Sequence, residues 1–190
     1  MEKKRCAWVN YQNPLYIRYH DEDWGVPVHE DRLLFEMLVL EGAQAGLSWE
    51  TILNKREAYR KAFNNFDPFQ VSKFNEDDVQ RLLTNPGIIR NKLKIHSAIK
   101  NAQALLNIQA EFGSFDIYLW SYVEGIPIIN SFFEHKDVPT STPISESLSK
   151  DLKKRGMSFI GPTIIYAYMQ SIGMVNDHTV DCYRHAELSK

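Results

Sequence analysis

The chain has 190 residues, of which 44% are hydrophobic and 24% charged, as is typical of a globular protein, and we expect residues 1–190 to form a single domain. A net charge of −2 excludes a protein that coats nucleic acid by bulk positive charge, although it does not exclude a local basic face. Because the sequence has no run of about 18 apolar residues and no apolar signal core near Met1, we expect no membrane partner and a cytoplasmic location.

The N-terminal segment, residues 6–29, is rich in aromatic side chains and poor in aliphatic ones. Pro14 favours the start of a short helix, in which Tyr16 and Tyr19 lie three residues apart on one face. Trp8 precedes this helix closely. Such aromatic side chains either complete the hydrophobic core or line a pocket, and the segment alone favours neither interpretation.

The next element is a helix over Leu33–Gly42 that is apolar on nearly every side, which is typical of a buried helix. Arg32 and Glu36 are four residues apart and are expected to form its one polar face. Glu41 is different, because the helical period places it on the apolar side. A lone buried charge costs several kcal/mol, so a carboxylate there must be paired, neutralised or used.

Small residues follow Glu41 over positions 42–48, and Trp49 closes the stretch. A buried acid beside a flat aromatic ring and a loop of small residues predicts a pocket for a planar, polar ligand. The alternative is that Glu41 ends its helix in water and that Trp49 belongs to the hydrophobic core.

Three helices are expected between residues 49 and 84. The first, Trp49–Phe63, places its basic side chains, including Arg56 and Arg60, on the outside. Asp67-Pro68 starts the second helix, and Asn75, which acidic residues follow, caps the third.

A tight turn over Asn85–Arg90 then joins the third helix to a long helix over about 91–106. This is a helix-hairpin-helix pattern, in which exposed backbone N–H groups can hold a phosphate. Lys92, Lys94 and Lys100 add positive charge on this side. The alternative is an ordinary hairpin of two helices, which is common in helical proteins.

The remaining helices are expected over residues 115–122, 145–155 and 163–172, with a long connection at Gly125–Thr142. Almost no stretch alternates apolar and polar residues as a half-buried strand does. We therefore assign the fold class as all-α.

The chain has two cysteines, Cys6 and Cys182, at opposite ends. His178 lies four residues before Cys182, a spacing of one turn on a helix face, and His20 lies near Cys6. Two cysteines and two histidines fit a closed tetrahedral zinc site, which would tie both ends of the chain together. The alternative is a surface histidine with an unpaired cysteine.

Motifs in one order along the whole chain resemble 3-methyladenine DNA glycosylase I, a family of the helix-hairpin-helix DNA glycosylases. They include Cys6-Ala7-Trp8, Pro14-Leu15-Tyr16, Tyr19-His20-Asp21, Trp24-Gly25-Val26-Pro27, LEGAQAGLSW at 40–49, Gly87-Ile88-Ile89-Arg90, LSKDLKKRG at 148–156, Phe159-Ile160-Gly161-Pro162-Thr163 and Val175-Asn176-Asp177-His178. The resemblance implies a helical glycosylase bundle whose termini are held by zinc. It also implies excision of 3-methyladenine from alkylated double-stranded DNA, with the free base as product, by a protein that we expect to be a monomer.

Carried over residue by residue, the resemblance assigns the metal ligands to Cys6, His20, His178 and Cys182. It assigns the base pocket to Glu41 with Trp8, Tyr16, Tyr19 and Trp49. Glu41 is then the candidate for both base recognition and catalysis, and we expect recognition to be its larger role. For DNA contacts we expect Leu47 as an apolar wedge and, around the hairpin, Gly87, Ile88, Arg90 and Lys92.

Many relatives in the wider superfamily carry a catalytic aspartate on the helix after the hairpin, but residues 91–111 contain no aspartate. The family resembled here is similar in lacking it. A methylated adenine in DNA is cationic and already a good leaving group, so recognition and positioning can suffice. The alternative function is a zinc-stabilised helical module that binds DNA or modified bases without cleavage.

Overall fold

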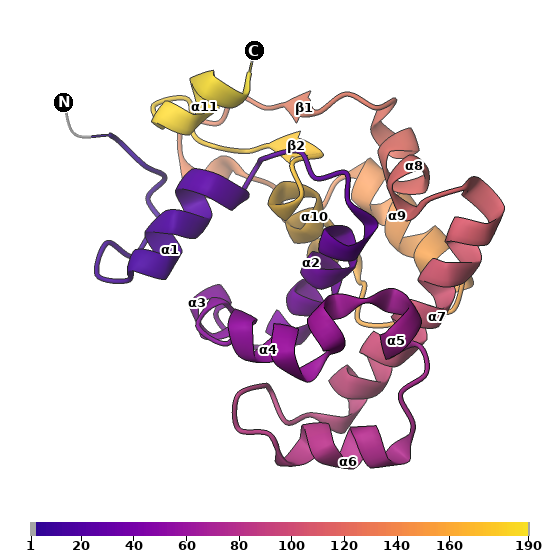
Figure 1. The fold of residues 1–190 in the computed structure, drawn as a ribbon. Coiled ribbons are helices and arrows are strands. Elements are labelled where there is room, and N and C mark those ends of the chain that lie inside the picture. The colour runs from indigo at the N-terminus through magenta and orange to yellow at the C-terminus, as the bar shows by residue number, and fades with distance from the viewer. Residues whose placement is uncertain (1–2, 190) are drawn as a thin grey trace.

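The structure, a computed structural model, describes residues 3–189. The chain is largely helical (Figure 1), with α1 (Pro14–Arg18), α2 (Asp31–Gln44), α3 (Trp49–Leu53), α4 (Arg56–Ala62), α5 (Pro68–Val71), α6 (Glu76–Thr84), α7 (Lys92–Phe112), α8 (Phe115–Trp120), α9 (Pro143–Lys154), α10 (Pro162–Ser171) and α11 (Tyr183–Leu188). Strands β1 (Ile128–Ile129) and β2 (Val175–Asn176) form one short parallel pair. The expected helical class is confirmed for the described residues, apart from this pair.

Helix α2 lies at the centre of the fold, as its apolar sequence predicts (Figure 1). Its residues from Leu34 to Ala43 are buried, and the helix packs against α3, α7, α8 and α10. Because neighbours surround α2, its polar side chains face other parts of the protein instead of water. This applies to both of its buried glutamates, Glu36 and Glu41.

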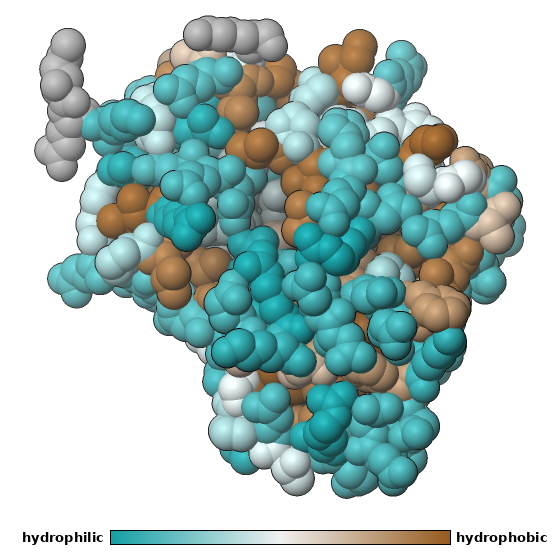
Figure 2. All heavy atoms as spheres, in the orientation of Figure 1, coloured by the Kyte–Doolittle hydropathy of each residue, from teal (hydrophilic) through white to brown (hydrophobic). Residues whose placement is uncertain are grey.

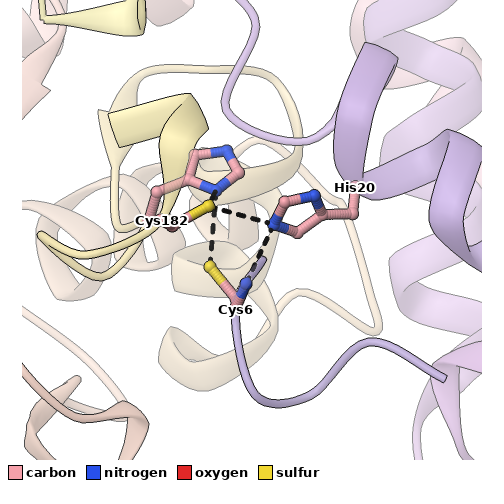
Figure 3. Close-up of side chains that lie close together, drawn as sticks. Cys6, His20 and Cys182 are labelled. Atoms are coloured by element: carbon pink, nitrogen blue, oxygen red, sulfur yellow. Dashed lines mark hydrogen bonds between the residues drawn. The ribbon is translucent and has the colours of Figure 1, made fainter. Parts of the chain in front are cut away.

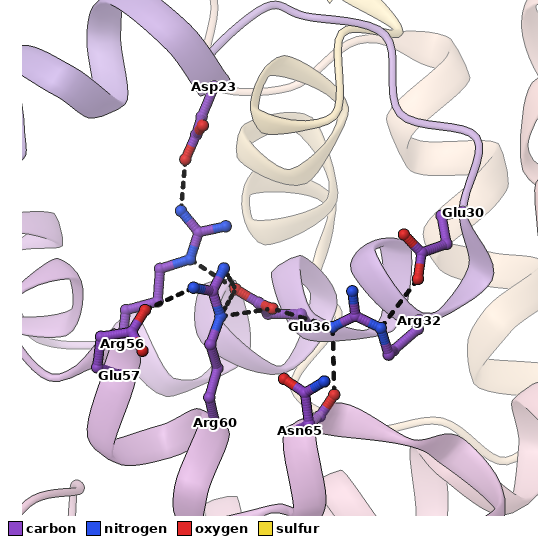
Figure 4. A network of polar contacts seen from close by, with 8 residues as sticks. All are labelled: Asp23, Glu30, Arg32, Glu36, Arg56, Glu57, Arg60 and Asn65. Carbon is purple, nitrogen blue, oxygen red and sulfur yellow. Dashed lines mark hydrogen bonds and ion pairs between the residues drawn. The ribbon is translucent and has the colours of Figure 1, made fainter.

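Glu36, which with Arg32 was expected to form the one polar face of this helix, is completely buried, and Arg32 Nη1 lies 4.0 Å from its carboxylate. Arg56 Nε lies 2.6 Å from Glu36 Oε1, and Arg60 Nη2 lies 2.8 Å from the same oxygen (Figure 4). These two arginines, which the sequence places outside, turn inward from α4. The physical reason is that a buried carboxylate requires charged hydrogen-bond partners, and each guanidinium group offers several donors.

Two helices and one pair of expected metal ligands differ clearly from the expectations, and most other helix ends differ by one or two residues. The helix expected over 49–63 is divided into α3 and α4, and α7 continues to Phe112, where Gly113 with a φ of +94° ends it. His178 and Cys182 do not share a helix face. They lie in the segment between β2 and α11, where a tight turn places the Cys182 N–H 2.8 Å from the Thr179 carbonyl oxygen.

Helices α6 and α7 form a helical hairpin whose connecting turn is held against α4. Lys55 Nζ, just before α4, donates to the Pro86 carbonyl oxygen at 2.9 Å. The Ile89 N–H donates to the Tyr59 hydroxyl at 3.1 Å. The turn is therefore fixed by side chains from outside the hairpin itself.

The two ends of the described chain meet on one side of the molecule (Figure 1). The Tyr183 N–H, at the start of α11, donates to the Lys4 carbonyl oxygen at 3.0 Å. This places the aromatic N-terminal segment beside the segment that carries His178 and Cys182.

The face drawn in Figure 2 is mainly hydrophilic, with hydrophobic side chains scattered over it. Among the helices of residues 3–189, none combines the length and the hydrophobicity needed to cross a bilayer.

Candidate functional site

A cavity of about 200 Å³ is lined by the N-terminal segment, α2, the start of α3 and α10. All five residues that the resemblance assigns to a base pocket line it: Trp8, Tyr16, Tyr19, Glu41 and Trp49. The structure therefore brings these side chains together around one cavity.

Half of the residues that line the cavity are Trp or Tyr. The ring centroids of Trp8 and Tyr16 are 5.4 Å apart, and those of Tyr19 and Trp49 are 5.0 Å apart. The indole N–H of Trp49 is buried and has no hydrogen-bond partner within residues 3–189. Buried N–H groups without an acceptor are rare in proteins. Separately, the Trp and Tyr rings of the wall offer flat faces on which a planar, electron-poor ring can stack.

Glu41 supplies the carboxyl group of the cavity. The residue is 4% exposed, and it forms no ion pair with any residue that the structure describes. Burial raises the pKa of Glu41 to about 8, and the nearby polar side chain of Ser171 opposes this rise. In the free protein Glu41 is therefore largely protonated at neutral pH.

The two buried glutamates of α2 differ in their partners. Glu36 is held by two arginines, whereas Glu41, five residues later, faces the cavity without a charged partner. An unpaired buried carboxylate costs stability, and such perturbed groups in clefts are typical of functional sites. The contrast between Glu36 and Glu41 indicates that the missing partner of Glu41 is a ligand.

The structure adds cavity residues that the sequence analysis did not assign: Trp24, Gln44, His135, Ala167 and Gln170. Gln44 follows Glu41 by three residues on α2, so helical spacing was a usable signal for it. Gln170 lies on α10, and its side-chain N–H donates to Asp177 Oδ2 at 2.7 Å. Residues from α10 and from the 3₁₀ turn at His135–Asp137 reach the cavity through tertiary packing, for which the sequence carries no local signal.

Behind the aromatic wall, the four expected metal ligands gather in the interior: Cys6, His20, His178 and Cys182. Figure 3 labels three of them, Cys6, His20 and Cys182. All four are buried, and their ligand atoms lie within 4.8 Å of one another. Cys6 Sγ is 3.4 Å from His178 Nδ1, and Cys182 Sγ is 3.4 Å from His20 Nε2. Tetrahedral bonds of about 2.3 Å to sulfur and about 2.1 Å to nitrogen separate such atoms by about 3.5 Å. The cluster therefore fits a tetrahedral metal ion.

Both histidines of the cluster are oriented by partners on their outer nitrogen atoms. His20 Nδ1 lies 2.8 Å from an oxygen of Asp21, and two guanidinium nitrogens of Arg5 bind that carboxylate in turn. His178 Nε2 lies 3.1 Å from the Trp24 carbonyl oxygen. A histidine whose outer N–H donates in this way presents its inner nitrogen unprotonated, as metal-binding histidines do.

The metal cluster and the cavity share a wall. Trp8 packs on His20 with ring centroids 5.2 Å apart, and Trp24 packs edge-on against His178 at 4.6 Å. Both tryptophans also line the cavity. A disturbance of the cluster is therefore expected to reach the aromatic wall.

The residues expected to contact DNA occupy different environments. Leu47, in the turn after α2, is 40% exposed, and Arg90 and Lys92 are exposed at the start of α7. Ile88 is 3% exposed, so its side chain belongs to the core. The Gly87 N–H donates to the Asn85 side chain at 2.8 Å, which leaves the unpaired N–H groups at the start of α7 as the available backbone donors.

The chain matches the family model described as methyladenine glycosylase over residues 8–185. It is 50% identical over 179 residues to DNA-3-methyladenine glycosylase 1 of Escherichia coli strain K12, which covers 94% of this chain and 95% of that protein. Its fold is similar to a crystal structure of 3-methyladenine DNA glycosylase I, with a TM-score of 0.92, 52% identity, and 95% and 98% of the two chains covered. A crystal structure of a variant of 3-methyladenine DNA glycosylase I in complex with 3-methyladenine aligns with a TM-score of 0.91 at 38% identity, covering 94% of this chain and 96% of that one.

Proposed function

This chain belongs to the methyladenine glycosylase family, and from that premise we propose that it is a DNA repair enzyme that hydrolytically excises 3-methyladenine from alkylated DNA. The observation that carries this proposal is the unpaired, buried Glu41 in a cavity walled by aromatic rings. The residues that line the cavity all come from one chain. We propose that residues 1–190 form one glycosylase domain and that the protein acts as a monomer.

Excision from a duplex requires that the nucleotide leaves the base stack, because the glycosidic bond is otherwise out of reach. Leu47, exposed beside the cavity, has the position and the apolar side chain of a wedge that fills the vacated space. The flipped base then stacks between Tyr and Trp faces. Its exocyclic N–H donates to Glu41.

The charge of the lesion explains the environment of Glu41. A 3-methyladenine base in DNA is cationic, and a nearby positive charge favours the ionised form of a carboxyl group. The base therefore provides the partner that Glu41 lacks in the free protein, while an uncharged adenine provides only hydrogen-bond donors. Because the cationic base is a good leaving group, the protein's main tasks are to select it and to position it.

We infer that the metal of the Cys6–His20–His178–Cys182 cluster is a structural zinc ion. Two thiolates and two neutral imidazoles are a common zinc ligand set, and four protein ligands leave no position for water or substrate. The buried cluster ties the N-terminal aromatic segment to the C-terminal segment. Zinc would thereby hold Trp8 in place without taking part in the chemistry.

The direct test of the proposed function is release of the free base. Duplex DNA carrying 3-methyladenine is incubated with the protein, and the supernatant is analysed for 3-methyladenine by chromatography. We expect release of the base and an abasic site in the DNA. Retention of the methylated duplex without any released base would instead support the alternative function, a binding module that does not cleave.

Duplex binding through the start of α7 is expected to be weak on undamaged DNA and strongly dependent on salt. Replacing Arg90 or Lys92 by alanine should weaken binding to all sequences alike, because a phosphate contact carries no base information. Each substitution should reduce the slope of log K against log [salt] by about 0.9. Binding titrations between low and moderate salt measure this.

Lys150→Ala serves as the control for the loss of one positive charge, since Lys150 is exposed on α9. It should leave the slope unchanged. A defect of Arg90→Ala or Lys92→Ala that appears only on damaged DNA would show that these residues recognise the lesion instead of the backbone.

A further inference from the structure

Of the three lysines that the sequence places near the hairpin, Lys94 is the one whose ammonium group points into the protein. Its Nζ donates to two backbone carbonyl oxygens at the end of α2, Ala43 O at 2.8 Å and Ala45 O at 2.7 Å. From the sequence, this lysine is expected to add positive charge to the hairpin face together with Lys92. In the structure Lys92 is exposed, whereas the Lys94 ammonium group is engaged by the central helix.

The end of helix α2 is closed in part by its own backbone and in part by Lys94. The last carbonyl groups of a helix lack intrahelical donors, and the helix dipole favours positive charge there. Helix α2 has no basic residue in its last turn. Gly46, directly after the capping residue Ala45, has a φ of +79°, and the Leu47 N–H donates to the Gln44 carbonyl oxygen at 2.6 Å, so this amide is not available to the Ala43 carbonyl group. Lys94 supplies both the missing donors and the missing charge from a different helix. Burial lowers the pKa of Lys94, so this arrangement has a desolvation cost that the carbonyl groups offset.

The contact joins the two parts of the protein that the proposed function uses. Lys94 lies in the first turn of α7, directly after the hairpin, and its own N–H donates to the Asn91 side chain at 3.1 Å. At the other end of the contact, Glu41 and Gln44 line the cavity, and Leu47 stands two residues beyond Ala45. The Lys94 side chain thus links the start of α7 directly to the turn that carries Leu47.

We propose that Lys94 is a positioning residue: by capping α2 from the start of α7, it sets the placement of Leu47 and Glu41 relative to the DNA backbone that the hairpin holds. This inference rests on the proposed function. Because the Lys94 ammonium group donates to Ala43 O and Ala45 O, we expect it to contact neither phosphate nor base. Its loss should therefore slow excision from DNA without reducing the number of phosphate contacts.

The test uses single-turnover excision at saturating DNA together with the salt dependence of duplex binding. Lys94→Met keeps most of the apolar stem and removes the charge. We expect its excision rate to fall by about 10-fold to 100-fold, the range for a misplaced catalytic geometry. Its salt slope should equal that of the unmodified protein, whereas Lys92→Met should lose about 0.9 from the slope. Lys150→Met should excise at the normal rate, which controls for the loss of one lysine.

Lys94→Arg keeps a cation that can reach the same carbonyl groups, so it should recover a large part of the excision rate. If Lys94→Met does not fold, Lys94→Gln, which keeps a donor without the charge, replaces it in every comparison. The proposal is overturned if the Lys94 variant excises normally, if its salt slope falls as that of Lys92→Met does, or if Lys94→Arg is as slow as Lys94→Met. Failure of the proposed function is a separate result, because the unmodified protein would then release no base at all.

Discussion

Replacement of Cys182 by alanine is expected to reduce bound zinc from one equivalent per chain to well below one and to lower the free energy of unfolding by several kcal/mol. Structural zinc contributes about 10–16 kcal/mol of apparent binding free energy in small zinc domains. Here the hydrophobic core stabilises much of the chain independently, so the loss should be smaller and concentrated at the two ends. Elemental analysis and denaturant unfolding measure the two quantities.

Non-additivity separates loss of the metal from loss of a side chain. Cys6→Ala should lower the free energy of unfolding about as much as Cys182→Ala does. The double variant should lower it little more than either single variant, because each change destroys the same site. A strong chelator should destabilise the unmodified protein and leave Cys182→Ala unchanged. Purified protein that contains no metal, or a melting temperature that does not respond to the chelator, would contradict the zinc assignment.

We also predict which parts of the chain lose stability in Cys182→Ala. Hydrogen exchange should accelerate in residues 4–24 and 175–188, while the amides of α7 and α9 keep their protection. Affinity for 3-methyladenine should then fall as well, since Trp8 and Trp24 pack on the metal-binding histidines. A uniform increase in exchange would show that the cluster supports the whole fold.

The helices whose pattern is local could be predicted from the sequence. The largely apolar helix α2 and the helices around the hairpin follow from periodicity and capping residues, and the structure confirms them. The split at Asn54–Lys55 could not be predicted, because neither residue is a strong helix breaker. Likewise, the inward turn of Arg56 and Arg60 depends on a carboxylate about 20 residues earlier in the chain, which a periodicity analysis does not consider.

In the candidate site, too, residues with a local sequence signal could be predicted, and residues placed by tertiary packing could not. Glu41 could be identified because a single charge interrupts an apolar helix face, and the aromatic segment could be identified by composition. Gln170 and His135 could not, since each is one polar residue among many until the tertiary fold places it at the cavity. Lys94 is expected from the sequence to face solvent, but its ammonium group points into the protein. This could not be predicted, because its acceptors are backbone carbonyl groups, which every residue has.

Replacement of Glu41 by glutamine is expected to stabilise the free protein at high pH. The pKa of Glu41 is about 8 in the folded state and about 4.5 when the chain is unfolded, so between these values the folded state binds more protons. The stability associated with the protonated group is complete below about pH 4.5 and is lost as the pH rises towards 8. By linkage this loss approaches about 5 kcal/mol as an order of magnitude. Glutamine is neutral throughout, so the advantage of the variant should grow over this pH interval and then level off.

Glu36→Gln is the matched control, because it is the same substitution on the same helix. It leaves two arginines facing a neutral amide and should destabilise the protein at pH 7, opposite in sign to Glu41→Gln. Urea unfolding between pH 5 and pH 8.5 compares the three proteins. If Glu41→Gln shows no growing advantage with pH, Glu41 is not a strained, unpaired acid in the free protein.

In the complex with methylated DNA the order of stability reverses, because the cationic base in DNA provides the charge that Glu41 lacks. The free base is neutral, but Glu41→Gln should still lose roughly 1–3 kcal/mol of affinity for it, the range for a hydrogen bond in which one partner, here the carboxylate, is charged. Excision from methylated DNA should fall but persist, since the lesion is already a good leaving group. A general base would behave differently: its loss would reduce the single-turnover rate by about 10²–10⁴ even at saturating DNA. Calorimetric binding of the free base beside single-turnover excision decides between the two roles, and a variant that binds the base normally yet hardly cleaves would show that Glu41 is the catalyst.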